Sequence, residues 1–150
     1  MIQPWEVVVV SSDLESRRDL SSILIRQGLD PICTSTLREC REIIGQKKVG
    51  VVFCDSHVSD GTYQDFLAGY RSRDERPRVI VTSRHSEWNQ FKEAIRLGAF
   101  DVISSPCRPT DVEWMIIQAK RDDRMRAAEP SAHAVVHLDT RLSEAAAALS

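Results

Sequence analysis

The sequence predicts an α/β protein in which helices cover both faces of a parallel sheet. Short apolar runs alternate five times with segments of helical period along the 150 residues, which is the pattern of strand–helix units wound around a parallel sheet. The third run, 51–55, is apolar until its final carboxylate, as expected for a strand buried on both faces. With 42% hydrophobic residues, the chain has enough apolar material for one ordinary domain.

Charge and cysteine content argue against several classes of protein. The 20 basic and 22 acidic residues give a net charge of −2 without a long block of either sign, so we expect no nucleic-acid-binding or membrane-binding surface. The four cysteines form no C-x-x-C pair, and we interpret them as reduced thiols. We see no charged and then apolar N-terminus and no apolar run near ~20 residues, so we expect a cytoplasmic protein.

The five strands are predicted from apolar runs that turn residues bound. Gly50 precedes the central strand, and Ser59, Asp60 and Gly61 form the turn after it. A charged loop at 71–78 precedes the fourth strand. The predicted strands are 6–10, 31–34, 51–55, 79–82 and 100–103.

The five helices are predicted from capping residues and from apolar side chains at helical spacing. The first spans 14–27, after the potential caps Ser11, Ser12 and Asp13, and ends before Gly28. Thr36 and Glu39 form a capping box for the second helix, which Gly45 ends. The later helices are marked by Tyr63, Phe66, Leu67 and Tyr70; by Trp88, Phe91 and Ile95 before Gly98; and by Thr110 and Glu113 as caps for Val112, Met115, Ile116 and Ala119.

The composition changes near the C-terminus. Residues 120–126 are almost all charged, and Pro130 would break a helix that continued through it. We therefore predict a domain at 1–128 and a tail or linker at 129–150 that is poorly ordered, because its short apolar run and alanine-rich stretch are too small to bury a core.

Polar side chains follow the ends of four predicted strands. Because the carboxyl ends of parallel strands meet at one edge of a sheet, we expect these side chains to lie together, where open α/β sheets place their functional groups. The carboxylate that ends the central strand is the most promising of them. The set is Ser11, Ser12, Asp13, Asp55, Thr82 and Ser105.

Three motifs occur in order along the chain. The first is an apolar strand that ends on Asp55, the second is a strand that ends on Thr82, and the third is a glycine–alanine pair before a strand that turns through Ser105–Pro106. In this combination the chain resembles the receiver domain of bacterial two-component response regulators over residues 6–128, and 54–61 is similar to that family's phosphorylation loop. The resemblance implies signal transduction in a phosphorelay. It also implies a flavodoxin-like (βα)5 fold with strand order 2-1-3-4-5.

The resemblance further implies that Asp55 accepts a phosphoryl group from a histidine kinase or phosphotransfer protein. The hydroxyl of Thr82 could donate to a phosphoryl oxygen and so sense this group, or it could bond locally to the backbone at the end of its strand. Asp55 and Thr82 are then the expected catalytic residues, and the protein is otherwise not expected to be an enzyme beyond self-phosphorylation from a phosphodonor. A hydrolase using Asp55 is disfavoured, because no histidine is placed as its base and no glycine-rich phosphate loop occurs.

The chain departs from the family at both sources of positive charge. Receiver domains hold Mg²⁺ with an acidic pair, the acceptor aspartate and a backbone carbonyl, and they carry a lysine before the proline after strand five. Here the acidic pair aligns with Ser11 and Ser12, and the lysine with Ser105. We expect weak Mg²⁺ binding at best, because serine hydroxyls are neutral and this dication prefers anionic oxygen. The remaining ligands would be Asp55, Asp13 and the backbone carbonyl of His57.

Two further features bear on the signal. Arg84 or Arg108 could supply positive charge at the site, although either is more often a solvated surface residue. Val102 replaces the aromatic switch residue that family members often carry.

Trp114 and Ile117 lie opposite the core stripe of the last helix, where the tail or a partner could cover them. The family dimerises through its last two helices, which favours a protein interface there.

Two hypotheses therefore remain open. In the first, Asp55 is phosphorylated and the change alters a protein interface on helices four and five. In the second, the domain is a degenerate pseudo-receiver that binds proteins without being phosphorylated. The family resemblance favours the first, and the missing lysine and acidic pair favour the second.

Overall fold

The computed structural model describes residues 5–70, 77–85 and 88–128. The chain divides into two compact units, Met1–Ala119 and Lys120–Ser150, and the sheet and the site lie in the first. The predicted boundary near Ala128 stays a prediction, and the predicted tail lies outside the described residues. The elements are β1 (Glu6–Val10), α1 (Leu14–Arg26), β2 (Ile32–Thr34), α2 (Leu37–Gln46), β3 (Val49–Asp55), β4 (His57–Val58), β5 (Gly61–Thr62), α3 (Tyr63–Ala68), β6 (Arg78–Ser83), α4 (Trp88–Leu97), β7 (Asp101–Ser104) and α5 (Pro109–Ala127).

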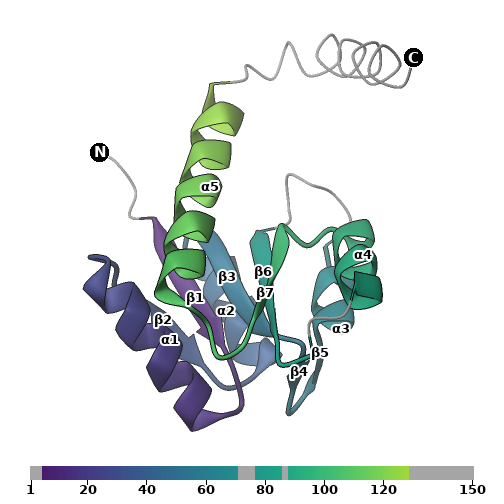
Figure 1. The fold of residues 1–150 in the computed structure, drawn as a ribbon. Coiled ribbons are helices and arrows are strands. Elements are labelled where there is room, and N and C mark those ends of the chain that lie inside the picture. The colour runs from purple at the N-terminus through teal and green to yellow at the C-terminus, as the bar shows by residue number, and fades with distance from the viewer. Residues whose placement is uncertain (1–4, 71–76, 86–87, 129–150) are drawn as a thin grey trace, which may run out of the picture. The chain divides into compact units, whose positions relative to one another are not determined.

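The main sheet is parallel and has the strand order β2-β1-β3-β6-β7 (Figure 1). These five strands are the five that the sequence predicts, so the predicted α/β fold and the order 2-1-3-4-5 are confirmed. The central strand β3 pairs with β1 on one side and with β6 on the other, and Asp55 lies opposite Thr82. The short strands β4 and β5 form a separate antiparallel hairpin that the sequence reading did not anticipate.

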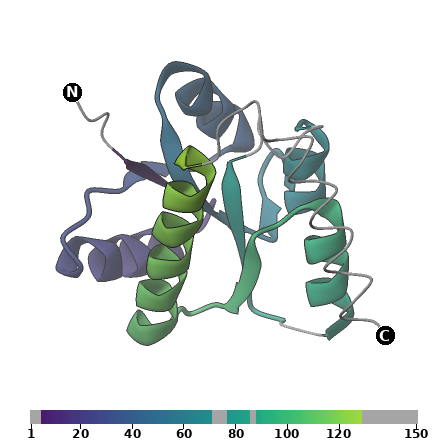
Figure 2. The same ribbon diagram turned by 90° about the horizontal axis from the view of Figure 1, so that it is seen from above.

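Helices cover both faces of the sheet, and alternate residues of the strands point to opposite faces. In β1, Val8 and Val10 belong to the core under α2, α3 and α4, whereas Val7 and Val9 belong to the core under α1 and α5. Figures 1 and 2 show this three-layer arrangement, with α1 and the sheet-facing part of α5 on one face. Because the central strands are buried on both faces, their sequences read as continuous apolar runs.

Strand β3 is longer than predicted and includes Gly50. A Cβ atom at Gly50 would lie 2.1 Å from Cε2 of Trp5, so the indole ring packs directly on the glycine backbone. The glycine is therefore required for close packing inside a strand, and the expectation that it marks the boundary of the strand was wrong.

Several other boundaries also differ from the prediction. Helix α2 continues past Gly45 and ends at Gln46. Arg78 is the first residue of β6 and is buried, because it pairs with Val51 and its guanidinium donates to the carbonyl of Gly50. Helix α5 begins at Pro109, a residue that favours the first helical position because its φ angle is fixed, so Thr110 lies inside the first turn.

Helix α4 leaves much of its apolar surface exposed. Ala94 is its fully buried residue, whereas Trp88 is 68% exposed and stacks on Phe91 with the ring centroids 5.3 Å apart. Ile95 is also exposed. Among the described residues, none of the helices combines the length and hydropathy that crossing a membrane requires.

Candidate functional site

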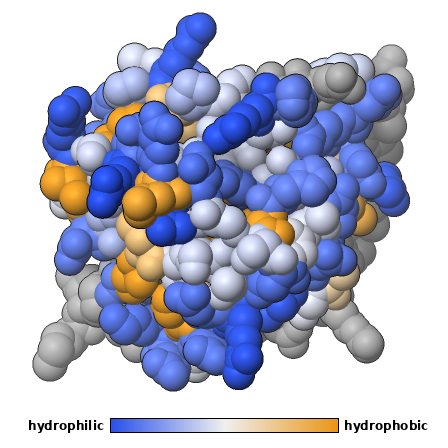
Figure 3. Space-filling model, turned by 90° about the horizontal axis from the view of Figure 1, so that it is seen from below, coloured by the Kyte–Doolittle hydropathy of each residue, from blue (hydrophilic) through white to orange (hydrophobic). Residues whose placement is uncertain are grey.

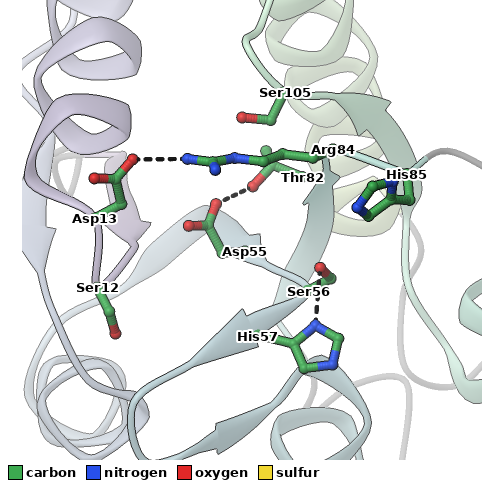
Figure 4. Close-up of a pocket in the computed structure, with 9 residues that line it drawn as sticks. All are labelled: Ser12, Asp13, Asp55, Ser56, His57, Thr82, Arg84, His85 and Ser105. Atoms are coloured by element: carbon green, nitrogen blue, oxygen red, sulfur yellow. Dashed lines mark hydrogen bonds and ion pairs between the residues drawn. The ribbon is translucent and has the colours of Figure 1, made fainter.

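A pocket of about 320 Å³ lies at the carboxyl ends of the central strands. Figure 3 shows this end of the molecule, where hydrophilic and weakly polar residues dominate and hydrophobic residues gather toward the side of α1. The lining side chains come from the ends of β1, β3, β6 and β7 and from the segments that follow them. They are Ser12, Asp13, Asp55, Ser56, His57, Thr82, Arg84, His85 and Ser105 (Figure 4).

The carboxylate of Asp55 accepts a hydrogen bond at each of its oxygens. The hydroxyl of Ser11 donates to Oδ2 and that of Thr82 donates to Oδ1, each over 2.5 Å. Ser11 and Thr82 are almost fully buried, whereas Asp55 is partly exposed. Asp55 is therefore oriented by two neutral donors and keeps its access to the pocket.

Ser12 stabilises the side of the pocket that is formed by β1 and α1. Its hydroxyl donates to the carbonyl of Ser35, over 3.0 Å, and accepts from the backbone N–H of Ser59, over 2.7 Å. These two contacts join the end of β1 to the loop after β2 and to the β4–β5 turn. The carbonyl of Ser11 is held as well, because Arg17 donates to it over 2.6 Å.

Asp13 is the N-cap of α1, and its side chain also pairs with Arg84 across the pocket. Its Oδ2 accepts from the hydroxyl and the backbone N–H of Ser16 and lies 2.9 Å from Nη2 of Arg84. The bonds from Ser16, aided by the charge of Arg84, hold the pKa of Asp13 below its ordinary value. Asp13 is therefore a capping carboxylate, as expected, and in addition the partner of a cation.

The hairpin next to the site is fixed by a second carboxylate. Asp60 accepts from the backbone N–H groups of Leu37, over 2.8 Å, and Arg38, over 3.1 Å, so it caps α2 from a distant part of the chain. Burial raises the pKa of Asp60, but these two donors outweigh it and the net shift is downward. Thr62 and Asp65 form a capping box that starts α3 directly after the hairpin.

The end of β6 is connected to α4 through Ser83. Its hydroxyl donates to Oε1 of Gln90 over 2.8 Å and accepts from the backbone N–H of His85 over 3.2 Å. Thr82, which contacts Asp55, is the preceding residue. The segment that carries Arg84 is therefore attached to Asp55 through Thr82 and to α4 through Ser83.

The thiols near the site are not reactive groups. Burial raises the pKa of Cys107 to about 12, with smaller contributions from Asp55 and Asp111. Cys54 precedes Asp55 in β3, and burial raises its pKa further. Because the thiolate is the reactive form of cysteine, burial disfavours nucleophilic chemistry at either thiol.

The donor set does not suit the Mg²⁺ ion that receiver domains generally bind at an acidic pocket. Within residues 5–70, 77–85 and 88–128, no group of three or more His, Cys, Asp or Glu side chains could hold a metal ion. Asp13 accepts hydrogen bonds from Ser16 and pairs with Arg84, and the hydroxyl of Ser11 donates a hydrogen bond to Asp55. Asp55 alone is a poor match for a dication that prefers several anionic oxygens.

Comparison with known proteins identifies the family to which the chain belongs. Residues 7–117 match the family described as the response regulator receiver domain, and the chain therefore belongs to that family. It is 24% identical over 120 residues to the regulatory protein AtoC of Escherichia coli and 22% identical over 101 residues to the response regulator protein PilR of Pseudomonas aeruginosa, covering 80% and 67% of this chain. It spans about a quarter of the length of these relatives, 26% and 23%.

Solved receiver structures resemble the chain over nearly their whole length. The signal receiver domain of a protein described as a LuxO repressor, from Vibrio parahaemolyticus, has a TM-score of 0.76 at 18% identity and covers 86% of this chain and 99% of its own. The beryllofluoride-activated NtrC4 receiver domain dimer has a TM-score of 0.71 at 26% identity, covering 78% and 97%. CheY4 of Vibrio cholerae has a TM-score of 0.68 at 15% identity, covering 77% and 98%.

The structure brings most of the predicted site residues together. Asp55, Thr82, Asp13 and His57 line one pocket, and the imidazole of His57 lies 3.3 Å from the hydroxyl of Ser56. Their roles as catalytic residues and metal ligands stay predictions. Trp114 and Ile117 line neither this pocket nor the small cavity behind Asp55. Both are exposed on α5, as predicted, and their place in an interface stays a prediction.

Sequence reasoning missed two side-chain contacts near the site. It considered Arg84 as a cation but did not predict its pairing with Asp13. It placed Asp60 in the turn after the central strand and did not predict that this residue caps α2. Both contacts join residues that are far apart in the sequence, 71 positions in one case and 23 in the other. The sequence did carry one usable signal, an arginine two residues after the strand-terminal Thr82.

Proposed function

We propose that this receiver domain accepts a phosphoryl group on Asp55 from a histidine kinase or phosphotransfer protein. The observation that carries the proposal is the position of Asp55, a carboxylate at the end of the central strand that opens into the pocket while Ser11 and Thr82 orient it. Membership of the receiver family supports it. Apart from this self-phosphorylation, we propose no enzymatic activity.

The reaction requires in-line attack by an oxygen of Asp55 on phosphorus. As the new O–P bond forms, the bond between phosphorus and the imidazole nitrogen of the donor breaks. The electron pair goes to that nitrogen, and the imidazole leaves. The hydroxyl of Thr82, which already donates to Asp55, then has a phosphoryl oxygen within reach, because hydroxyl donors rotate to suit their acceptors.

Intact-mass analysis after incubation with acetyl phosphate and MgCl₂ tests this proposal. Here the leaving group is acetate, and we expect a single labile phosphate adduct on the wild-type chain and none on Asp55→Asn. Asp60→Asn is a matched control, because Asp60 is a carboxylate of the same loop that lines neither the site pocket nor the small cavity behind Asp55. We expect this variant to form the adduct as the wild type does. Absence of an adduct on the wild type, or its persistence on Asp55→Asn, contradicts the proposal.

The output of the domain is proposed to be a protein interface on α4 and α5. Support comes from the large apolar side chains that these helices expose: Trp88 and Ile95 on α4, and Trp114 and Ile117 on α5. Aromatic residues at the centre of an interface contribute much of its binding energy. We expect sedimentation velocity to show self-association that Trp114→Ala weakens; a monomer in both proteins, with and without acetyl phosphate, contradicts a dimer.

A second candidate function is a protein-interaction module that works without phosphorylation. One observation favours it: the charged groups of the pocket already have partners within the chain, Asp55 with Ser11 and Thr82, and Arg84 with Asp13. In that case, Asp55→Asn binds the partner protein as tightly as the wild type does, and the adduct is absent from both. Partner binding that depends on the adduct rejects this candidate.

A further inference from the structure

We propose that Arg84 is the resident cation of this site and that it binds the phosphoryl oxygens on Asp55 in place of a divalent metal, leaving Asp13 as it does so. The inference rests on the proposed function for the covalent group, and it adds how the charge of that group is balanced. It assigns to Arg84 and Asp13 a paired role that neither the family nor the fold supplies.

The position of Arg84 supports this assignment. Strand β6 ends at Ser83, and Arg84 is the next residue, two positions after the Thr82 hydroxyl that contacts Asp55. In Figure 4 its side chain extends across the pocket above Asp55 and Thr82 and reaches Asp13 on the far wall. A guanidinium on this path is next to the place where a phosphoryl group on Asp55 must lie.

The charges of the pocket favour the exchange. Two carboxylates, Asp13 and Asp55, face one guanidinium. The Arg84–Asp13 pair is exposed, 67% for the arginine side chain and 44% for the aspartate, so solvent screens it and its strength is low. A phosphoryl group offers about two negative charges and three acceptor oxygens, and the planar guanidinium matches such oxygens with two parallel N–H donors.

Asp13 does not depend on Arg84, because it remains bonded to Ser16 as the cap of α1 when the arginine leaves. Ser105 also makes room. Its short side chain lines the same pocket at the position where the resemblance places a lysine, so no second cation competes for the phosphoryl group from that strand end. The movement of Arg84 therefore leaves no carboxylate or cation without a partner.

The exchange would also carry a signal to α4. The Arg84–Asp13 pair ties the segment after β6 to the start of α1, and Ser83 ties the same segment to Gln90 of α4. Release of the Arg84–Asp13 pair detaches the segment from α1, while Thr82 still contacts Asp55 and Ser83 still contacts Gln90 of α4. This route does not use the aromatic residue that Val102 replaces.

Acetyl phosphate labelling in the presence of excess EDTA tests the inference, with the adduct followed by intact mass. We expect the wild type to form the adduct without metal, and Arg84→Gln to form it about 10- to 100-fold more slowly, the effect of losing a hydrogen bond between charged groups. Arg84→Lys should fall between them. Arg108→Gln is the matched control, because Arg108 is an exposed arginine at the same edge that lines neither described pocket, and it should behave as the wild type.

The outcomes separate this inference from the proposed function. An adduct that requires MgCl₂ and forms equally on the wild type and Arg84→Gln overturns the inference and leaves Asp55 as the acceptor. If no adduct forms under any condition, the proposed function fails, and titration with inorganic phosphate decides the role of Arg84. If added phosphate changes the amide chemical shifts of Thr82 and Ser83 in the wild type but not in Arg84→Gln, the result supports an anion site at Arg84. If phosphate changes these chemical shifts in neither protein, the inference is overturned.

Discussion

The wall of the pocket formed by β1 and α1 differs from the wall formed by β6 and the segment after it. On the first wall, Ser12 and Asp13 bind other parts of the scaffold, and the Ser11 hydroxyl donates a hydrogen bond to Asp55. On the second, Thr82 and Arg84 present a hydroxyl and a cation to the pocket. The first wall therefore contributes mainly to the stability of the fold, and the second carries the two groups that the proposed function would use to bind a phosphoryl group.

Ser11→Asp should have the largest effect, because it places a second carboxylate beside Asp55 at a site that is 2% exposed. A hydrogen bond is replaced by repulsion between like charges, and an uncompensated buried charge costs about 3 kcal/mol or more. Urea unfolding at neutral pH measures this loss, and MgCl₂ should recover part of it. Ser12→Asp, at an exposed position, is the control with the smaller loss; equal stability of Ser11→Asp and the wild type contradicts the assignment of this wall.

Thr82→Val should have the next largest effect on the unfolding free energy. It keeps the shape of the side chain and removes the hydroxyl that donates to Asp55, and a hydrogen bond to a charged group contributes about 1.5–3 kcal/mol. Thr34→Val is a matched control, because Thr34 is a buried threonine at the end of β2 whose bond to the Val9 carbonyl is long, 3.4 Å. Unfolding free energies that fall equally in both variants would remove the special role of the Asp55 contact.

Ser12→Ala tests the structural wall directly. It removes two hydrogen bonds, to the Ser35 carbonyl and from the Ser59 amide, and should cost about 1–2 kcal/mol of unfolding free energy. Labelling of Asp55 by acetyl phosphate should be unchanged once the variant is folded. Labelling that falls in parallel with stability would mean that this wall also takes part in the chemistry.

Asp60→Ala should have the smallest effect, about 1 kcal/mol, the usual cost of a lost helix cap, and it should depend on pH. Because the folded pKa of Asp60 is below its ordinary value of 3.8, its contribution is complete above that value and is lost as the pH falls through the folded pKa. Urea unfolding should show a difference at pH 7 that shrinks in acid. Asp30→Ala, at an exposed position before β2, is the control, and a difference that grows in acid would contradict the capping role.

Local patterns were enough to predict the sheet and its helices. The consecutive valines of β1 and the apolar run of β3 are typical of strands buried on both faces. Alternate residues of these strands do pack into two different cores, which confirms the prediction. The gathering of Asp55 and Thr82 also followed from chain order, because parallel strands end at one edge. Boundaries were harder to predict, since the role of Gly50 depends on the ring of Trp5, which contacts it from outside the strand.

The fold and the position of Asp55 could be predicted from the amino-acid pattern, because apolar periodicity is local and strand order follows from connectivity. The groups that surround the Asp55 carboxylate are set by tertiary packing. Ser11 and Thr82 both bond to it, Arg84 reaches Asp13 across the pocket, and Asp60 caps a helix that begins 23 residues earlier. These contacts depend on side-chain directions after the chain has folded, and spacing in the sequence does not specify which side chains pair.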